Sequence, residues 1–127
     1  GCKLKAYRRP AGVWTIGWGR TTNVKAGDTC TQAQADAWLI DEYDAFEATV
    51  LETLGKAKVT PNQLGAMVSL AYNIGVGAFA KSTLLKKHIA GNYAGAAMEF
   101  GKWKFAGREV LPGLVKRRAA EAALYLL

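Results

Sequence analysis

The sequence predicts a mainly helical α+β domain, in which a small β region precedes a bundle of helices. Residues 1–30 are rich in glycine, threonine and aromatic side chains, whereas apolar residues recur at gaps of three and four from residue 31 onward. The 127 residues are half apolar, which suits one hydrophobic core. We therefore expect a single domain, with a β-containing part (1–30), a long connecting helix (31–54) and a helical bundle (60–127).

The first predicted element is a β-strand at residues 13–16. Its side chains, from Val13 to Ile16, are β-branched or aromatic, and glycines stand on both sides of it. The segment from Thr22 to Asp28 carries Asn, Gly and Asp and is typical of a turn. Together these features indicate a β-hairpin or a three-stranded ribbon.

A long amphipathic helix should follow. Thr31 and Gln34 form a capping-box pattern at its start, and Gly55 is a suitable stop. Its apolar face is formed by Ala35, Leu39, Tyr43, Phe46, Val50 and Leu54.

The next helix is predicted over residues 61–74. A capping threonine, Thr60, precedes Pro61 at the first helical position, and Gln63 follows at the third. The helix is apolar almost all round, which is typical of the middle of a domain. Gly75 and Gly77 should end it.

Three shorter helices complete the expected bundle. Ser82 can cap a helix that reaches Ile89, and Asn92 can cap one that reaches about Lys104. A last helix opens at Pro112, and its predicted apolar face is formed by Val115, Ala119, Ala122 and Leu126.

The net charge favours certain classes of binding partner but does not decide among them. The formal net charge is +7, which favours polyanions such as nucleic acid, acidic lipid or an anionic cell envelope. The basic run Lys116–Arg118 on an amphipathic helix is typical of a solvated face, and no recognised nucleic-acid motif is present. A nucleic-acid or membrane binder is therefore the weakest hypothesis. No apolar run approaches the ~20 residues of a membrane helix, and we expect no signal peptide and no stable membrane insertion.

Cysteine and histidine are sparse. Cys2 and Cys30 are isolated in sequence and His88 is the one histidine, a pattern that disfavours a zinc site. A Cys2–Cys30 disulfide is open, although two buried free thiols fit the pattern better. His88 is expected on a helix surface, Ser82 as a cap rather than a nucleophile, and Trp103 in packing.

Several fragments in fixed order resemble one family. They are Leu4–Tyr7, Gly12–Gly19, Leu70–Gly75 with Phe79, Ser82–Lys86, Trp103, and Leu111–Glu121. Each motif alone is weak, but the ordered set resembles the phage lysozymes, or endolysins, of glycoside hydrolase family 24 almost end to end.

The resemblance implies a two-lobed fold with a sugar cleft between the β part and the helical bundle. It implies hydrolysis of the β-1,4 bond between N-acetylmuramic acid and N-acetylglucosamine in peptidoglycan, for host cell lysis. No cofactor and no metal are implied. Such a protein is expected to be a monomer that stays in the host cytoplasm until lysis and then acts on the cell wall.

The resemblance also assigns site residues. The family's general acid is a glutamate that would stand immediately before the segment matching Gly1. Arg9 occupies the position of the family's second catalytic residue, which is usually Asp or Cys, and Thr15 matches the threonine that positions water. The candidate substrate-binding residues are Asn73, Trp18, Arg20 and Arg117. The family also places an arginine near the acid, and either Arg117 or Arg118 could be that arginine.

The departures from the family bear on the chemistry. Residues 1–27 contain no Asp or Glu, and Arg9 cannot act as a base because guanidinium stays protonated. Glycoside hydrolysis needs two carboxyl roles, so we expect the 127 residues as they stand to be inactive or weak. Truncation and a decayed or repurposed relative are both open, and the alternative function is a non-catalytic peptidoglycan-binding module.

The other carboxylates are expected to take no part in catalysis. Glu121 with Arg117 should form a surface pair on the last helix. The acidic side chains of the long helix should form a solvated face; they are Asp36, Asp41, Glu42, Asp44, Glu47 and Glu52.

Overall fold

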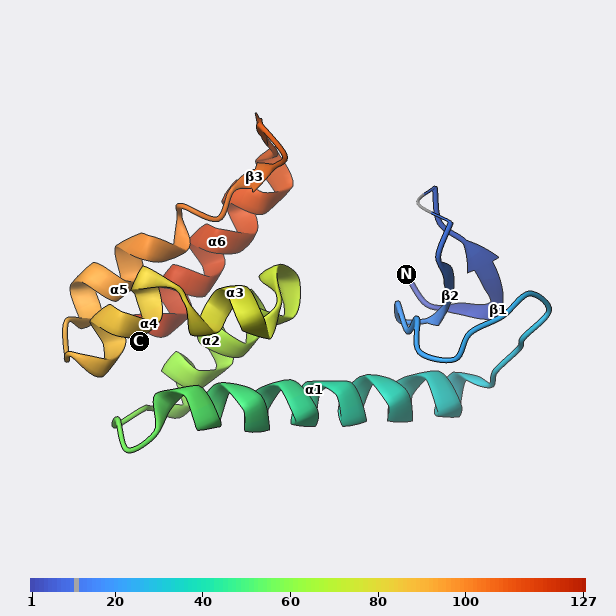
Figure 1. Cartoon of the computed structure of the whole chain (residues 1–127), viewed down its shortest axis with the longest axis horizontal. Coiled ribbons are helices and arrows are strands. Elements are labelled where there is room, and N and C mark those ends of the chain that lie inside the picture. Colours follow the sequence, from blue (N-terminus) through green and yellow to red (C-terminus); the bar gives the residue numbers. More distant parts are fainter. Residues whose placement is uncertain (11) are drawn as a thin grey trace. The chain divides into compact units, whose positions relative to one another are not determined.

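A computed structural model describes residues 1–10 and 12–127 of the chain. The chain divides into two compact units, residues 1–44 and residues 45–127. The first unit holds a β-hairpin and the second is a helical bundle (Figure 1). The predicted mainly helical α+β class is confirmed.

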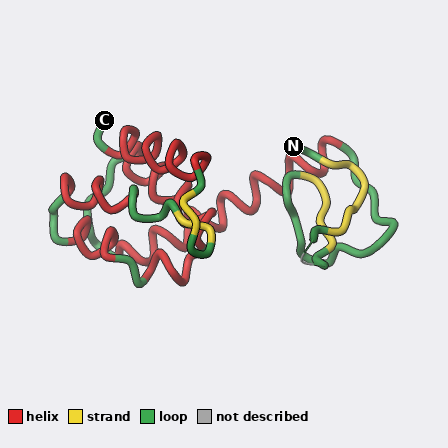
Figure 2. Tube along the Cα trace, turned by 90° about the horizontal axis from the view of Figure 1, so that it is seen from above, coloured by secondary structure: helices red, strands yellow, loops and turns green. Residues whose placement is uncertain are grey.

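The hairpin of the first unit joins β1 (Lys3–Arg8) to β2 (Trp14–Gly17) in antiparallel register. A third segment runs beside β1, because the Ala6 amide donates to the Asp28 carbonyl (2.8 Å) and the Cys30 amide donates to the Leu4 carbonyl (2.9 Å). Of the two expected forms, the hairpin is present as a two-stranded sheet, with the third segment bridged to it only at Lys5 and Thr29. The strand β1 is one that the sequence had not placed individually (Figure 2).

The helix α1 (Gln32–Leu54) begins where it was predicted. The Thr31 amide donates to Gln34 Oε1 (2.9 Å), and the Gln34 amide donates to Thr31 Oγ1 (3.1 Å), which completes the capping box. Gly17 lets β2 approach this helix, because a Cβ at Gly17 would lie 3.2 Å from the Cβ of Ala35. Gly17 also has φ +64°, a conformation that favours glycine.

The second unit is built around α2 (Pro61–Ile74), which has the predicted bounds. Around it lie α3 (Val76–Ala80), α4 (Thr83–Ile89), α5 (Tyr93–Phe100) and α6 (Pro112–Tyr125), with the short hairpin of β3 (Phe105–Ala106) and β4 (Glu109–Val110) before α6. The α2 side chains Ala66, Met67, Val68, Leu70 and Ala71 are all buried. They form one core with residues such as Phe79, Leu84, Phe100 and Tyr125.

Three local predictions about helix ends are confirmed. Thr60 and Gln63 form a full capping box at α2, Ser82 Oγ accepts from the Leu85 amide at α4, and Asn92 Oδ1 accepts from the Gly95 amide at α5. Each pattern involves residues within three positions of one another, so the sequence alone carries the information.

Two longer-range expectations are wrong. The α5 helix ends at Phe100 rather than near Lys104, because the chain turns there toward the β3–β4 hairpin around Gly107 (φ +64°). The face of α6 that is buried carries Arg118, Glu121 and Tyr125, whereas Val115 and Leu126 are 43% and 62% exposed.

His88 is also misplaced by the sequence analysis. It is 1% exposed, with its Nδ1 2.6 Å from the Tyr125 hydroxyl and its Nε2 2.9 Å from the Lys58 carbonyl oxygen. Both ring nitrogens of His88 therefore have hydrogen-bond partners inside the bundle, which is why this polar ring can be buried there.

Two further predictions concern the thiols and Trp103. Cys2 and Cys30 are free thiols, but both are half-buried rather than buried. Burial, and then the neighbouring Cys2, raise the pKa of Cys30. Trp103 packs against the core, as predicted. Within the part of the chain that the structure describes, no helix is both long and apolar enough to cross a membrane.

Candidate functional site

Trp18 stands directly after β2 and is tied to the start of α1. Its side chain is 42% exposed, and its Nε1–H donates to Asp36 Oδ1 at 2.8 Å. The same carboxylate oxygen accepts from Gln32 Nε2 at 2.9 Å. These hydrogen bonds, from Trp18 and then from Gln32, lower the pKa of Asp36. Asp36 therefore fixes the indole edge while it remains on the exposed acidic face that the sequence predicts.

Arg20 is held by two side chains of α1. Its guanidinium carbon lies 4.7 Å from the centroid of the Trp38 ring, and its Nη1 lies 3.9 Å from Glu42 Oε1. The backbone of Arg20 exchanges two hydrogen bonds of 2.9 Å with Ile16. The side chain and the backbone of Arg20 are thus both held within the first unit, and Glu42 is its ion-pair partner.

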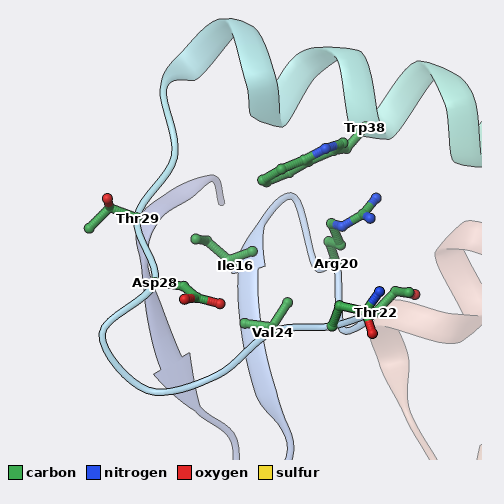
Figure 3. A pocket seen from close by; sticks show the side chains of 8 residues that line it. Ile16, Arg20, Thr22, Val24, Asp28, Thr29 and Trp38 are labelled. Atoms are coloured by element: carbon green, nitrogen blue, oxygen red, sulfur yellow. The ribbon is translucent and has the colours of Figure 1, made fainter.

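A small pocket opens beside Arg20 (Figure 3). It measures about 170 Å³ and lies between β2, the turn at 22–29 and Trp38 of α1. The turn is closed by the Lys25 amide, which donates to Asp28 Oδ2 at 2.9 Å. The pocket walls are formed by Ile16, Arg20, Thr22, Asn23, Val24, Asp28, Thr29 and Trp38.

Thr15 and Arg9 occupy contrasting positions in the hairpin. Thr15 is fully buried, and its hydroxyl donates to the Val13 carbonyl oxygen at 3.3 Å. Arg9 is exposed, and its Nη2 lies 3.5 Å from the point where a Cβ would stand at Gly19. While it donates to Val13, the Thr15 hydroxyl can still accept a hydrogen bond through its oxygen.

Asn73 lies at the end of α2 in the second unit, and Arg118 of α6 contacts it. Asn73 is exposed, whereas Arg118 is 1% exposed. Arg118 Nη1 donates to Asn73 Oδ1 at 2.9 Å. The structure therefore joins the sugar-binding candidate of α2 to a buried guanidinium.

Glu121 completes this buried group. Arg118 Nη2 donates to Glu121 Oε2 at 3.1 Å, and Arg118 Nε lies 2.6 Å from Glu121 Oε1, off the direction of a hydrogen bond. The Ser69 hydroxyl also donates to Glu121 Oε2, one helical turn before Asn73 on α2.

Arg117 and Glu121 form the predicted i, i+4 pair, with Arg117 Nε 4.0 Å from Glu121 Oε2. The pair is not wholly at the surface as expected, because Arg117 is 48% exposed whereas Glu121 is 5% exposed. Sequence reasoning also missed Ser69, whose only signal is its place four residues before Asn73 on one helix face.

The carboxylates that are buried are already paired. Glu99 is 4% exposed and binds Lys102 and, at 3.8 Å, Lys87. Glu121 is held by Arg118 and Ser69. The oxygens of both carboxylates are thus engaged inside the second unit rather than offered to a ligand.

Comparison with known proteins gives one consistent result. A family model described as phage lysozyme matches residues 1–121. The chain is 49% identical to an endolysin of Acyrthosiphon pisum secondary endosymbiont phage 1, over 98% of this chain and 88% of that protein. It is 43% identical to an endolysin of Bacillus phage PZA over 98% of this chain, but spans only 49% of that relative's length.

Solved structures agree with this result. The fold is similar to the muramidase domain of SpmX from Asticaccaulis excentricus, with a TM-score of 0.87 and 34% identity. That superposition covers 100% of this chain and 88% of the other.

Proposed function

The chain belongs to the phage lysozyme family of glycoside hydrolases, and on this premise we propose that it works as an endolysin that degrades host peptidoglycan. The bond cleaved would be the β-1,4 linkage between N-acetylmuramic acid and N-acetylglucosamine. The observation that carries the proposal is a family match over residues 1–121, together with relatives that align over nearly the whole chain.

The site residues receive roles within this proposal. Trp18 would offer its exposed indole to a sugar face, since its N–H is already engaged by Asp36. Arg20, Arg117 and Asn73 would bind sugar oxygens. Thr15 would position a water through its hydroxyl oxygen, which can accept while the proton is donated to Val13, and Arg9 would supply positive charge rather than a base.

The proposed reaction also needs a general acid to protonate the leaving oxygen. Residues 1–27 contain no carboxylate, and the buried Glu99 and Glu121 are engaged in ion pairs. We therefore expect the 127 residues, tested as they stand, to cleave peptidoglycan weakly or not at all. The loss of a general acid typically lowers a rate by ~10²–10⁴-fold.

The test compares the 127 residues with a version extended by a helix that ends in glutamate immediately before Gly1. Release of reducing ends from purified peptidoglycan is measured for both. The extended version should release them, and the unextended chain should stay near a heat-killed control.

A matched control carries the same added helix ending in glutamine. It should remain as inactive as the unextended chain, because glutamine cannot donate a carboxyl proton. Equal release from the glutamine and glutamate versions would refute the acid role. Strong release from the unextended chain would show that another carboxylate serves as the acid.

The second candidate function is a peptidoglycan-binding module without catalysis. Arg9 and Arg20 favour it, because the resemblance leads us to expect Asp or Cys in place of Arg9, and His in place of Arg20 after Gly17-Trp18-Gly19. This reading expects sedimentation with purified peptidoglycan in the absence of cleavage, whether or not the added glutamate is present. In either reading the partner is the glycan strand, the protein acts as a monomer, and it meets the wall after the inner membrane is breached.

A further inference from the structure

Arg118 is the largest of the fully buried side chains, and its surroundings explain how its charge is tolerated. A buried guanidinium is costly unless it is paired and hydrogen-bonded. Glu121 supplies both carboxylate oxygens within 3.1 Å of Arg118, and Ser69 donates to the same carboxylate. One guanidinium nitrogen, Nη1, is left to point along α2, and it donates to Asn73.

This contact determines which way the Asn73 amide faces. A guanidinium has only donors, so it can bind the oxygen of a carboxamide and not its NH₂ group. Asn73 Oδ1 is therefore turned toward Arg118, at 2.9 Å. Because Asn73 is exposed, its NH₂ group is the part of the amide that is free to meet a ligand.

We propose that Arg118, held in place by Glu121 and Ser69, is a positioning residue that fixes the Asn73 amide with its NH₂ group toward the glycan. Asn73 then recognises a sugar oxygen that accepts a hydrogen bond, such as the carbonyl of an N-acetyl group. The proposal rests on the peptidoglycan function proposed above. Within that function, Arg118 does not contact the sugar, but it determines that Asn73 presents a hydrogen-bond donor to it.

The physical gain is preorganisation. A free carboxamide can present either end, so binding must first select one orientation. A fixed amide has already lost that freedom, and its rejected orientation would leave two donors facing each other. Sites that are held by a supporting shell of hydrogen bonds gain specificity in this way.

The first test changes the polarity of the contact. Asn73→Asp keeps an oxygen for Arg118 but replaces the NH₂ donor by a second acceptor. Affinity for the hexamer of N-acetylglucosamine is measured by titration of the whole chain, beside Asn73→Ala. Both variants should bind about 3- to 10-fold more weakly, the range of one hydrogen bond. Binding by Asn73→Asp as tight as the unchanged chain would overturn the donor assignment.

The second test removes the positioning residue without leaving a buried charge. Arg118→Met combined with Glu121→Met replaces the whole ion pair by apolar side chains, a change that often leaves stability unaltered. This double variant should weaken binding by about the same factor as Asn73→Ala. Adding Asn73→Ala to it should cause little further loss, because the two effects act through one group.

Lys116→Met is the matched control, since it removes one positive charge from the same helix at an exposed position. It should leave the affinity within twofold of the unchanged chain. Fully additive losses from the Asn73 change and the ion-pair change would contradict the proposal.

A measurement without ligand separates this inference from the proposed function. The Asn73 side-chain NH₂ group should be rigid in ¹⁵N relaxation of the unchanged chain, and mobile in the Arg118→Met, Glu121→Met variant. If the unchanged chain failed to bind the hexamer while the NH₂ group was rigid, the glycan function would be at fault. If the NH₂ group were equally mobile in both proteins, the positioning role would be wrong.

Discussion

His88 and Tyr125 show how single buried polar residues are arranged in this chain. The Lys58 carbonyl can only accept, so His88 Nε2 donates to it, while His88 Nδ1 shares a hydrogen bond with the Tyr125 hydroxyl. Each ring nitrogen therefore has a partner inside the bundle. The partners lie 30 and 37 residues from His88 in the chain, which is why helical periodicity placed this residue on the surface.

The first prediction at this scale concerns Tyr125→Phe. The change leaves His88 Nδ1 buried without its hydrogen-bond partner, and should lower the free energy of unfolding by about 1–3 kcal/mol at neutral pH. Denaturant unfolding followed by circular dichroism measures it. Tyr93→Phe is the control, because Tyr93 also packs on His88 but is 39% exposed, and it should cost much less.

The same pair predicts a pH dependence. Burial, and then Tyr93, raise the pKa of Tyr125 to about 12, above its ordinary value of 10.0. The stability from Tyr125 is thus present below pH 10 and is lost as the pH rises toward 12, because the unfolded chain releases this proton first. The gap in stability between the unchanged chain and Tyr125→Phe should shrink over that range. A gap that stayed constant would contradict the burial of this hydroxyl.

At the scale of elements, local signals were sufficient for some helices and insufficient for others. The bounds of α2 followed from Thr60, Pro61 and Gln63, which act on neighbouring backbone groups. The buried face of α6 did not follow, because Arg118 and Glu121 look like surface residues until Ser69 and Asn73 of α2 are placed beside them. The family resemblance gives Asn73 as a candidate, whereas its contact with the buried Arg118 could be found only in the structure.

The prediction at this scale is that Thr60→Ala weakens α2. The Gln63 amide loses its acceptor, Thr60 Oγ1 at 3.1 Å, and the reciprocal bond to Gln63 Oε1 loses its support. The cost should be about 1 kcal/mol in the free energy of unfolding. Thr60→Ser keeps the hydroxyl and should cost only a fraction of this in the same denaturant experiment. Equal costs for the two variants would mean that the methyl group, not the cap, matters.

At the scale of the molecule, the two units differ in the core that each possesses. The buried cluster from Val50 to Tyr125 lies entirely within residues 45–127. The first unit buries few apolar side chains, namely Ala6, Ile16 and Ala35. Burial of apolar area is the main source of stability, so the units should open with different free energies.

Native-state hydrogen exchange should therefore show two levels of protection. Amides of α2 should exchange only through global unfolding, whereas amides of β1 and β2 should exchange through a smaller opening, at a free energy at least ~2 kcal/mol lower. The dependence on low denaturant distinguishes the two classes of opening. A single protection level across both units would show that they unfold as one cooperative body.

The buried Arg118–Glu121 pair has a consequence for how this sequence can change over generations. Losing either partner alone strands the other charge in the core, at a cost of about 3–5 kcal/mol. Such a loss is a large part of the 5–15 kcal/mol that holds a typical domain folded. Substitutions at positions 118 and 121 are therefore expected to occur together rather than singly. A library that varies them jointly should yield far more folded clones than two libraries that vary each position separately.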